Sequence, residues 1–153
     1  MKKIILPVLA ATLLMAACET ASDSQNVNVG TAAAPGTAGD FKNNIKDRAF
    51  FAYDKSTVSA DAKKVLEAQA AWLKTYGTTT ATVEGKADMR GTAHYNMALG
   101  ARRAEAAKKA LVAAGVDANR LKTMSLGKEK LEVMGDTEEA HVQNRVAITV
   151  INQ

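Results

Sequence analysis

From residue 41 onward, segments in which apolar residues recur at every second position alternate with segments in which they recur at the helical period. Residues 79–85 and 145–151 alternate apolar and polar side chains as a half-buried strand does. Residues 60–77 and 92–114 instead place apolar side chains three or four positions apart. Shorter strands are predicted at 49–54 and 121–126, and a short helix at 137–144. This order predicts an α+β fold, an α/β sandwich with helices packed on a mixed sheet of about four strands.

Residues at the predicted helix ends support these boundaries. Ser59 and Thr92 stand where a side-chain oxygen caps the first turn of a helix. Gly77 and Gly115 stand where the long helices are expected to end.

The N-terminus has the layout of a secretory signal peptide. Lys2 and Lys3 precede an apolar run of 12 residues, 4–15, and two alanines. The run is too short to span a bilayer, which needs about 20 apolar residues. We therefore expect residues 1–17 to be a signal peptide.

The end of this segment, Leu14-Met15-Ala16-Ala17-Cys18, resembles the lipobox of bacterial lipoproteins, with Met15 where Leu is preferred. The resemblance implies cleavage before Cys18, its lipidation, and anchoring in outer-membrane lipid, since several acyl chains make a stable anchor. The alternative is an ordinary secreted protein with a free Cys. Glu19 stands where an Asp often signals retention in the inner membrane, so the outer membrane is favoured, with the domain facing the periplasm.

Residues 18–40 are predicted to be the lipidated Cys and a flexible linker, and residues 41–153 to be one domain. After Cys18 the linker is rich in small and polar residues, and its only bulky aliphatic residues are Val27 and Val29. Such a segment buries too little apolar surface to offset its ordering entropy. As a coil of about 22 residues it would span roughly 25 Å. It is either a leash to a distant layer or a tail without a role.

Composition argues against a nucleic-acid partner. The formal net charge is +4, and loss of Lys2 and Lys3 leaves 18 basic and 16 acidic residues, a net charge of +2. Aromatic residues make up 5% of the chain, and no basic stripe with interleaved aromatics appears. The single cysteine excludes a Cys-based zinc site, and no motif calls for a metal or a cofactor.

A charged loop joins the strand at 79–85 to the helix that Thr92 caps. Loops between a strand and a helix N-terminus are common ligand sites in sheets covered by helices. Asp88 supplies a negative group, and Arg90 and Arg103 supply planar donors for a carboxylate. These three charged residues suit a zwitterionic ligand, although a solvated turn with surface arginines would show the same sequence pattern.

The motifs in this region closely resemble the OmpA-like peptidoglycan-binding domain, especially that of the peptidoglycan-associated lipoproteins. The matching residues are 51–56, 88–92, 95–96, 98–100, 102–104, 115–116, 127–129 and 144–145. The resemblance covers residues 49–151. It implies a protein that binds the diaminopimelate of the peptidoglycan stem without cleaving it, and that ties the outer membrane to the cell wall within the Tol-Pal system.

The resemblance also implies the binding residues. Asp88 would bind the ammonium of diaminopimelate and Arg103 its carboxylate, with Thr92, Asn96 and Arg145 at or beside the pocket. Spacing alone would not pair Arg103 with Asp88, because Arg103 lies about 16 Å along the helix from Thr92.

Three departures from the family pattern stand near this site. Lys86 replaces a usual His and could compete with the ligand ammonium for Asp88. Val146 replaces a frequent second Arg, and Leu126 and Leu131 stand where many relatives have an aromatic residue and a Pro.

Two alternatives to a peptidoglycan binder remain. An enzyme would need an acid–base pair or a metal site. His94 and His141 are expected to be surface helix residues, and Glu84 lies on the polar face of its strand, so no catalytic residue is predicted. The second alternative is a lipid-anchored interaction module whose main ligand is a periplasmic protein such as TolB, which the family also binds.

Overall fold

The structure is a computed structural model, and it describes residues 33–152. The predicted signal peptide, Cys18 and most of the predicted linker lie outside the described residues. In chain order the elements are α1 (Ala38–Asp40), the π-helix η1 (Phe41–Ile45), β1 (Arg48–Phe50), α2 (Ala60–Thr75), β2 (Thr80–Lys86), α3 (Ala93–Ala113), the 3₁₀ helix η2 (Ala118–Arg120), β3 (Leu121–Gly127), α4 (Glu138–Asn144) and β4 (Val146–Asn152).

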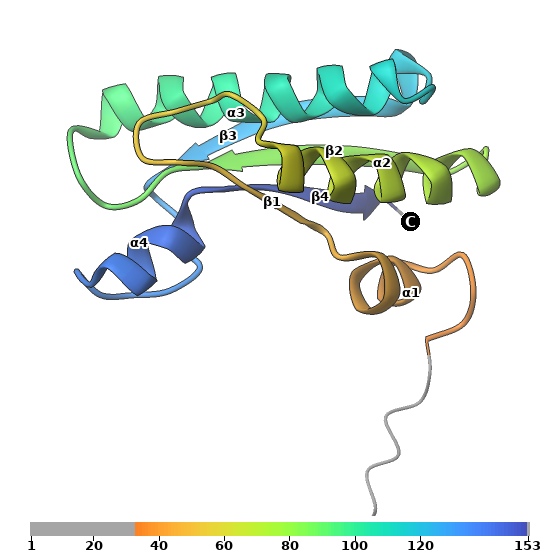
Figure 1. Ribbon diagram of the computed structural model, residues 1–153, viewed down its shortest axis with the longest axis horizontal. Coiled ribbons are helices and arrows are strands. Elements are labelled where there is room, and N and C mark those ends of the chain that lie inside the picture. Colours follow the sequence, from red (N-terminus) through yellow and green to blue (C-terminus); the bar gives the residue numbers. More distant parts are fainter. Residues whose placement is uncertain (1–32, 153) are drawn as a thin grey trace, which may run out of the picture. The chain divides into compact units, whose positions relative to one another are not determined.

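The four strands form one mixed sheet in the order β1-β4-β2-β3. β4 runs antiparallel to both β1 and β2, whereas β2 and β3 are parallel. A parallel pair needs a crossover connection, and α3 provides it. Figure 1 shows α3 lying along β2 and β3, with α2 beside it. The predicted α+β class, with a mixed sheet of about four strands, is confirmed.

Side-chain caps start α2, α3 and α4. Ser59 Oγ accepts a hydrogen bond from the Ala62 backbone N–H, which starts α2. Thr92 Oγ1 accepts one from the Tyr95 N–H, which starts α3. Thr137 does the same for α4. A capping oxygen satisfies a backbone donor that the first turn leaves unpaired, so the helix starts predicted at Ser59 and Thr92 are confirmed.

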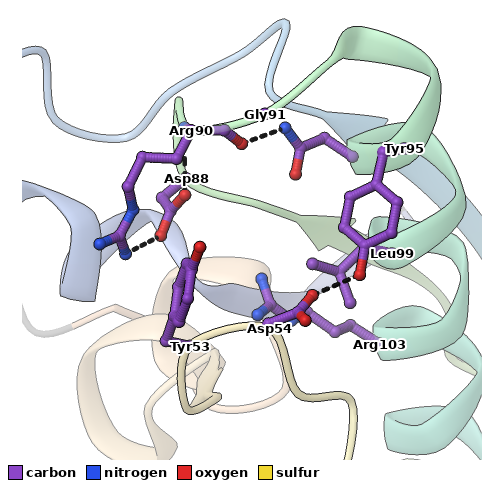
Figure 2. Close-up of a pocket in the computed structure, with 9 residues that line it drawn as sticks. Tyr53, Asp54, Asp88, Arg90, Gly91, Tyr95, Leu99 and Arg103 are labelled. Carbon is purple, nitrogen blue, oxygen red and sulfur yellow. Dashed lines mark hydrogen bonds and ion pairs between the residues drawn. The ribbon is translucent and has the colours of Figure 1, made fainter.

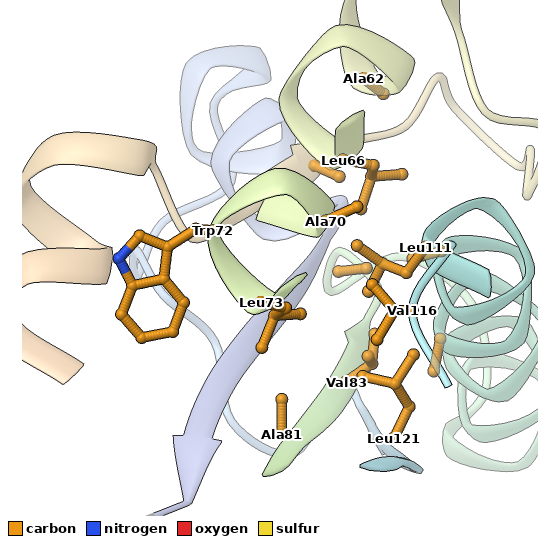
Figure 3. Close-up of a cluster of buried hydrophobic side chains, with 14 of the residues drawn as sticks. Ala62, Leu66, Ala70, Trp72, Leu73, Ala81, Val83, Leu111, Val116 and Leu121 are labelled. Carbon is orange, nitrogen blue, oxygen red and sulfur yellow. The ribbon is translucent and has the colours of Figure 1, made fainter. Parts of the chain in front are cut away.

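The hydrophobic core lies between α2, α3 and the helix-facing side of the sheet (Figure 3). Leu66 and Leu73 of α2 meet Leu111 of α3 over Val83 of β2, and all four side chains are almost completely buried. Trp72 of α2 packs against the segment that precedes β1. Its ring packs edge-on against Phe41 at 4.9 Å, and its Nε1 donates to Asp40 Oδ2 at 2.9 Å.

The folded unit therefore begins before residue 41. Ala38–Asp40, the last three residues of the predicted linker, form α1, and Asp40 is hydrogen-bonded to Trp72. No periodicity marks so short a helix. A contact with a residue 32 positions later stabilises it.

A pair of glycines sets the spacing between α3 and the sheet. A Cβ placed on Gly85 of β2 would lie 1.8 Å from the Gly100 carbonyl oxygen, and one on Gly100 would lie 2.7 Å from the Gly85 carbonyl oxygen. No side chain fits at either position, so backbone packs directly on backbone. This close approach places the next turn of α3, which carries Arg103, over the end of β2.

Candidate functional site

A pocket of about 130 Å³ opens where the end of β2 meets the first turns of α3. Three segments line it: the loop after β1, the loop between β2 and α3, and α3 itself (Figure 2). The lining residues are Tyr53, Asp54, Asp88, Arg90, Gly91, Tyr95, Asn96, Leu99 and Arg103. Two carboxylates and two guanidinium groups thus share one small space.

Asp88 is the buried anion of the pocket, with 4% of its surface exposed. Its Oδ2 accepts a hydrogen bond from Arg90 Nη2 at 2.5 Å, and its Oδ1 accepts one from the Arg90 backbone N–H at 3.2 Å. Burial alone would raise the pKa of Asp88, but the hydrogen bonds and charge of Arg90 outweigh it and lower that pKa. Asp88 is therefore ionised at neutral pH.

Arg103 is the buried cation, and none of its surface is exposed. Its guanidinium donates to three backbone carbonyls: from Nε to Lys55 at 2.8 Å, from Nη1 to Lys86 at 2.8 Å, and from Nη2 to Ala52 at 3.1 Å. Burial lowers the pKa of Arg103 to about 10, against the opposing effect of the Asp88 charge, so the group stays charged at neutral pH.

The three carbonyl bonds do not use all of the Arg103 donors. A guanidinium has five N–H groups. Within residues 33–152, one N–H on Nη1 and one on Nη2 have no protein acceptor. Two such donors on a planar group match the geometry of a carboxylate.

The remaining wall joins the loop after β1 to α3. The Tyr95 hydroxyl donates to Asp54 Oδ1, and Asn96 Nδ2 donates to the Arg90 carbonyl at 2.7 Å. Asp54 has a φ of 54°, in the left-handed region that Asp tolerates better than most residues. Asn96 thus holds the loop that carries Asp88 and Arg90 against the start of α3.

The structure brings three of the five predicted binding residues into the pocket lining: Asp88, Asn96 and Arg103. Thr92 caps α3 and does not line the pocket. Arg145 lies behind Asp88, with its Nη1 3.5 Å from Asp88 Oδ2 and 2.8 Å from Glu138 Oε1. Thr92 and Arg145 therefore lie beside the pocket and support it.

Sequence reasoning missed the wall formed by Tyr53 and Asp54. Both follow β1 in the chain and reach the pocket because Arg103 binds the carbonyls of Ala52 and Lys55 on either side of them. The available signals were the polar residues at the end of the predicted strand and the match of residues 51–56 to the family motifs. Nothing local indicated that this loop would fold against the end of β2.

Comparison with known proteins assigns the chain to the family that its motifs resemble. A model of the OmpA family matches residues 50–145. The "Peptidoglycan-associated lipoprotein" of Mesorhizobium japonicum is 44% identical, with 97% of this chain and 91% of that protein covered. The chain belongs to the OmpA family. The protein of the same name from Haemophilus influenzae is 38% identical, with 92% of each chain covered.

A solved OmpA-family structure has the same fold. The crystal structure of the peptidoglycan-associated lipoprotein from Burkholderia pseudomallei matches with a TM-score of 0.70 at 33% identity. The match covers 76% of this chain and all of that one. The family resemblance predicted from the motifs is confirmed.

The structure gives Lys86, one of the departures from the OmpA-family pattern, a different role from the one expected. Lys86 is buried outside the pocket, where its Nζ pairs with Glu132, which also accepts from Arg48 Nη1 at 2.7 Å. Lys86 therefore does not compete for Asp88; the cations beside Asp88 are Arg90 and Arg145. Val146 is completely buried, although it is not part of the core cluster between the helices and the sheet, which its neighbour Ala147 joins.

The expectation that both histidines lie on the surface is wrong for His141. Its surface is 4% exposed, and its Nε2 lies 3.1 Å from Asp136 Oδ1. His94 is exposed. In residues 33–152, no group of three His, Cys, Asp or Glu side chains could hold a metal ion. No helix of this part is both long and apolar enough to cross a membrane.

Proposed function

We propose that this chain binds peptidoglycan non-covalently through the pocket between β2 and α3, and that its ligand is the free end of a diaminopimelate side chain. That end carries an ammonium and a carboxylate on one carbon. Asp88 receives the ammonium, and the two remaining N–H groups of Arg103 receive the carboxylate. The observation that carries the proposal is the presence of one buried anion and one buried cation in the lining of a single pocket.

The size of the pocket supports an end group as the ligand. Pockets for drug-sized molecules are roughly 300–1,000 Å³, whereas this one is about 130 Å³. A sugar ring of the glycan strand would not fit beside the charged groups. A terminal amino acid group at the tip of a stem peptide would, and each charged hydrogen bond contributes about 1.5–3 kcal/mol.

The rest of the proposal places the domain in the cell envelope. Acylation of Cys18 anchors the chain in the outer membrane, and the domain reaches through the periplasm to the cell wall. The names of the relatives, "Peptidoglycan-associated lipoprotein", support both the lipid anchor and the cell-wall ligand. By the same family relationship, the chain acts within the Tol-Pal system in envelope integrity and cell division.

Sedimentation with purified sacculi tests the ligand and the site together. The Asp88→Ala variant should bind at least tenfold more weakly, since 1.4 kcal/mol is a factor of ten in affinity. Arg102→Ala is the matched control: Arg102 precedes Arg103 but is exposed and lies outside the pocket lining. Equal binding by wild type and folded Asp88→Ala would place the site elsewhere.

The same incubation tests the non-enzymatic assignment. Glu84, the carboxylate that would accompany Asp88 in a glycosidase, does not line the pocket. Sacculi mixed with the protein should therefore release no soluble fragments above the level of a protein-free control. Release of muropeptides that Asp88→Ala abolishes would show that the domain is an enzyme.

A second candidate ligand is a periplasmic protein such as TolB. Four large apolar side chains near the pocket are substantially exposed: Tyr53, Met89, Tyr95 and Met97. Aromatic and Met side chains of this kind are enriched in protein interfaces. Purified TolB should then compete with sacculi for the chain. If Asp88→Ala abolished sacculus binding but left partner binding intact, the two ligands would share a surface but depend on different residues of it.

A further inference from the structure

Asp88 is already paired with a cation of its own chain. Arg90 Nη2 lies 2.5 Å from Asp88 Oδ2, where the ammonium of the proposed ligand would have to bind. Both Asp88 oxygens accept hydrogen bonds from Arg90, one from the side chain and one from the backbone. A ligand ammonium that takes this position on Asp88 Oδ2 thus has to displace the Arg90 side chain.

The two arginines of the pocket differ in how firmly they are held. Arg103 is fully buried and bonded to three backbone carbonyls. The Arg90 side chain is 34% exposed, and its guanidinium lies over the Tyr53 ring at 4.2 Å. Its Nε is buried, yet it has no hydrogen-bond partner among residues 33–152. An unpaired buried donor weakens the hold on this position, so Arg90 is the cation that can leave.

A second acceptor already stands next to Arg90. Glu138 Oε2 lies 3.4 Å from Arg90 Nη1, and the Glu138 side chain is 59% exposed. Its other oxygen, Oε1, accepts from Arg145 Nη1 at 2.8 Å, which keeps the carboxylate near the pocket. A small rotation of the Arg90 side chain would shorten the contact with Glu138 as it opens the contact with Asp88.

We propose that Arg90 holds the place of the ligand ammonium on Asp88, and that binding transfers its guanidinium from Asp88 to Glu138. The inference rests on the proposed function and adds a basis for specificity. A ligand ammonium replaces the Arg90 charge on Asp88, whereas without one Asp88 keeps only Arg145, whose Nη1 lies 3.5 Å from Oδ2. A ligand with a carboxylate but no ammonium leaves Arg90 in place and gains only the contacts with Arg103.

The test is calorimetric titration of the mature chain in detergent with a soluble diaminopimelate-containing muropeptide. Arg90→Ala should raise the affinity roughly tenfold, because no internal ion pair has to be broken first. Arg90→Gln, which keeps most of the side-chain volume, should also raise it. A muropeptide with α-aminopimelate, which lacks the ammonium, should bind weakly and gain nothing from either substitution.

Glu138→Gln identifies the place to which Arg90 moves. With Arg90 present, this substitution should lower the affinity for the diaminopimelate muropeptide severalfold. In the Arg90→Ala background it should have no effect, since no guanidinium then needs a new acceptor. This non-additivity separates a coupled pair from two independent structural residues. Arg102→Ala, which removes an exposed positive charge outside the pocket lining, is the charge-matched control and should not change affinity.

The outcomes separate the two proposals. Weaker or unchanged binding by Arg90→Ala, with binding still lost in Asp88→Ala, would overturn the placeholder role and leave the proposed function intact. Binding that is insensitive to Asp88→Ala would overturn the proposed site, and the placeholder role with it. The absence of binding by both wild type and Arg90→Ala would overturn both.

Discussion

At the scale of single residues, Arg103 has two functions in one side chain. It joins the loop after β1 to the end of β2 through its three carbonyl bonds, and it presents two further donors to the pocket. Arg103→Ala would leave these carbonyls without their donor, at about 1–3 kcal/mol for each one that stays buried. We therefore expect the free energy of unfolding to fall by at least about 3 kcal/mol.

Urea unfolding measures this loss, since the midpoint should fall at an unchanged m-value. Arg103→Lys should be intermediate, because an ammonium keeps the charge but lacks the planar fork. Asp88→Ala is consequently the cleaner probe of ligand binding. A change below about 1 kcal/mol in Arg103→Ala would show that water replaces the lost donors and that the role of Arg103 in joining the two segments is minor.

Asp88 gives a pH-dependent prediction at the same scale. Its pKa is lowered in the folded state, so the ionised carboxylate stabilises the fold. That contribution is fully present above the unfolded-state pKa, for which the reference value is 3.8, and is lost as pH falls through the folded-state pKa. The stability difference between wild type and Asp88→Asn should be constant from pH 7 to about 5 and should shrink below about 3.8.

Unfolding in urea at several pH values checks this. The matched control is Asp61→Asn, since the Asp61 side chain is 95% exposed and, among residues 33–152, pairs only with Lys64 at 3.4 Å. A difference for Asp88→Asn that persisted unchanged at pH 3 would mean that its charge is not what stabilises the fold.

At the scale of elements, the sequence predicted what local patterns encode. Period-two alternation located β2 and β4, and the capping residues located the starts of α2 and α3. α1 and η1 were not predicted, because they depend on the contacts of Asp40 and Phe41 with Trp72, on another helix. β1 is also shorter than predicted, since after Phe50 the chain turns into the pocket loop.

The contact between α3 and β2 gives the element-scale prediction. Ala normally stabilises a helix relative to Gly by about 1 kcal/mol. At position 100 the added Cβ would meet the Gly85 carbonyl and Ser125 Oγ, at 2.7 and 2.4 Å. Gly100→Ala should therefore destabilise the domain by about 1–3 kcal/mol, as overpacking does. It should also weaken ligand binding, because α3 must move away from the strand end.

Gly77→Ala is the matched control for thermal unfolding of this variant. A Cβ at Gly77 meets nothing within 4 Å, so the substitution should be neutral or slightly stabilising. If both variants unfolded at the wild-type temperature, the backbone contact between Gly85 and Gly100 would not limit the position of α3.

At the scale of the whole molecule, the site forms where distant segments meet. Motifs supplied Asp88, Asn96 and Arg103, but only the fold brings residues 52–55 into bonding distance of Arg103. The spacing of residues in the sequence also could not predict that Arg103 and Asp88 share one pocket. α3 runs back along β2, and the long Arg side chain reaches the strand end only because Gly85 and Gly100 allow close packing. Such contacts depend on tertiary geometry that no sequence period encodes.

The proposed lipid anchor on Cys18 gives a prediction for the entire chain. Cys18 follows an apolar run and two alanines at a predicted cleavage point. Cys18→Ala should abolish incorporation of labelled fatty acid and leave the chain uncleaved or cut elsewhere, because the proposal makes the thiol the acceptor for the diacylglycerol. Met15→Leu restores the preferred lipobox residue and should keep the label. Equal labelling of wild type and Cys18→Ala would refute the lipidation proposal.

The distance between anchor and domain gives the last prediction. Residues 19–37 separate Cys18 from α1, and about 19 extended residues reach roughly 60 Å. Deleting residues 20–30 leaves eight, which reach only about 27 Å. The deletion spares Asp40 and its bond to Trp72, so the thermal midpoint and sacculus binding in vitro should not change. Cross-linking of the anchored chain to the cell wall in cells should fall, because the pocket no longer reaches its ligand.

Replacing the same residues with eleven Gly and Ser residues is the control for length. If reach is what matters, this variant should restore cross-linking to the wild-type level, because a Gly/Ser chain of equal length spans a similar distance. If cross-linking stayed low, the side chains of residues 20–30 would have a role of their own. If the deletion itself had no effect, the domain would bind the wall within the shorter reach, and residues 20–30 would not serve as a leash.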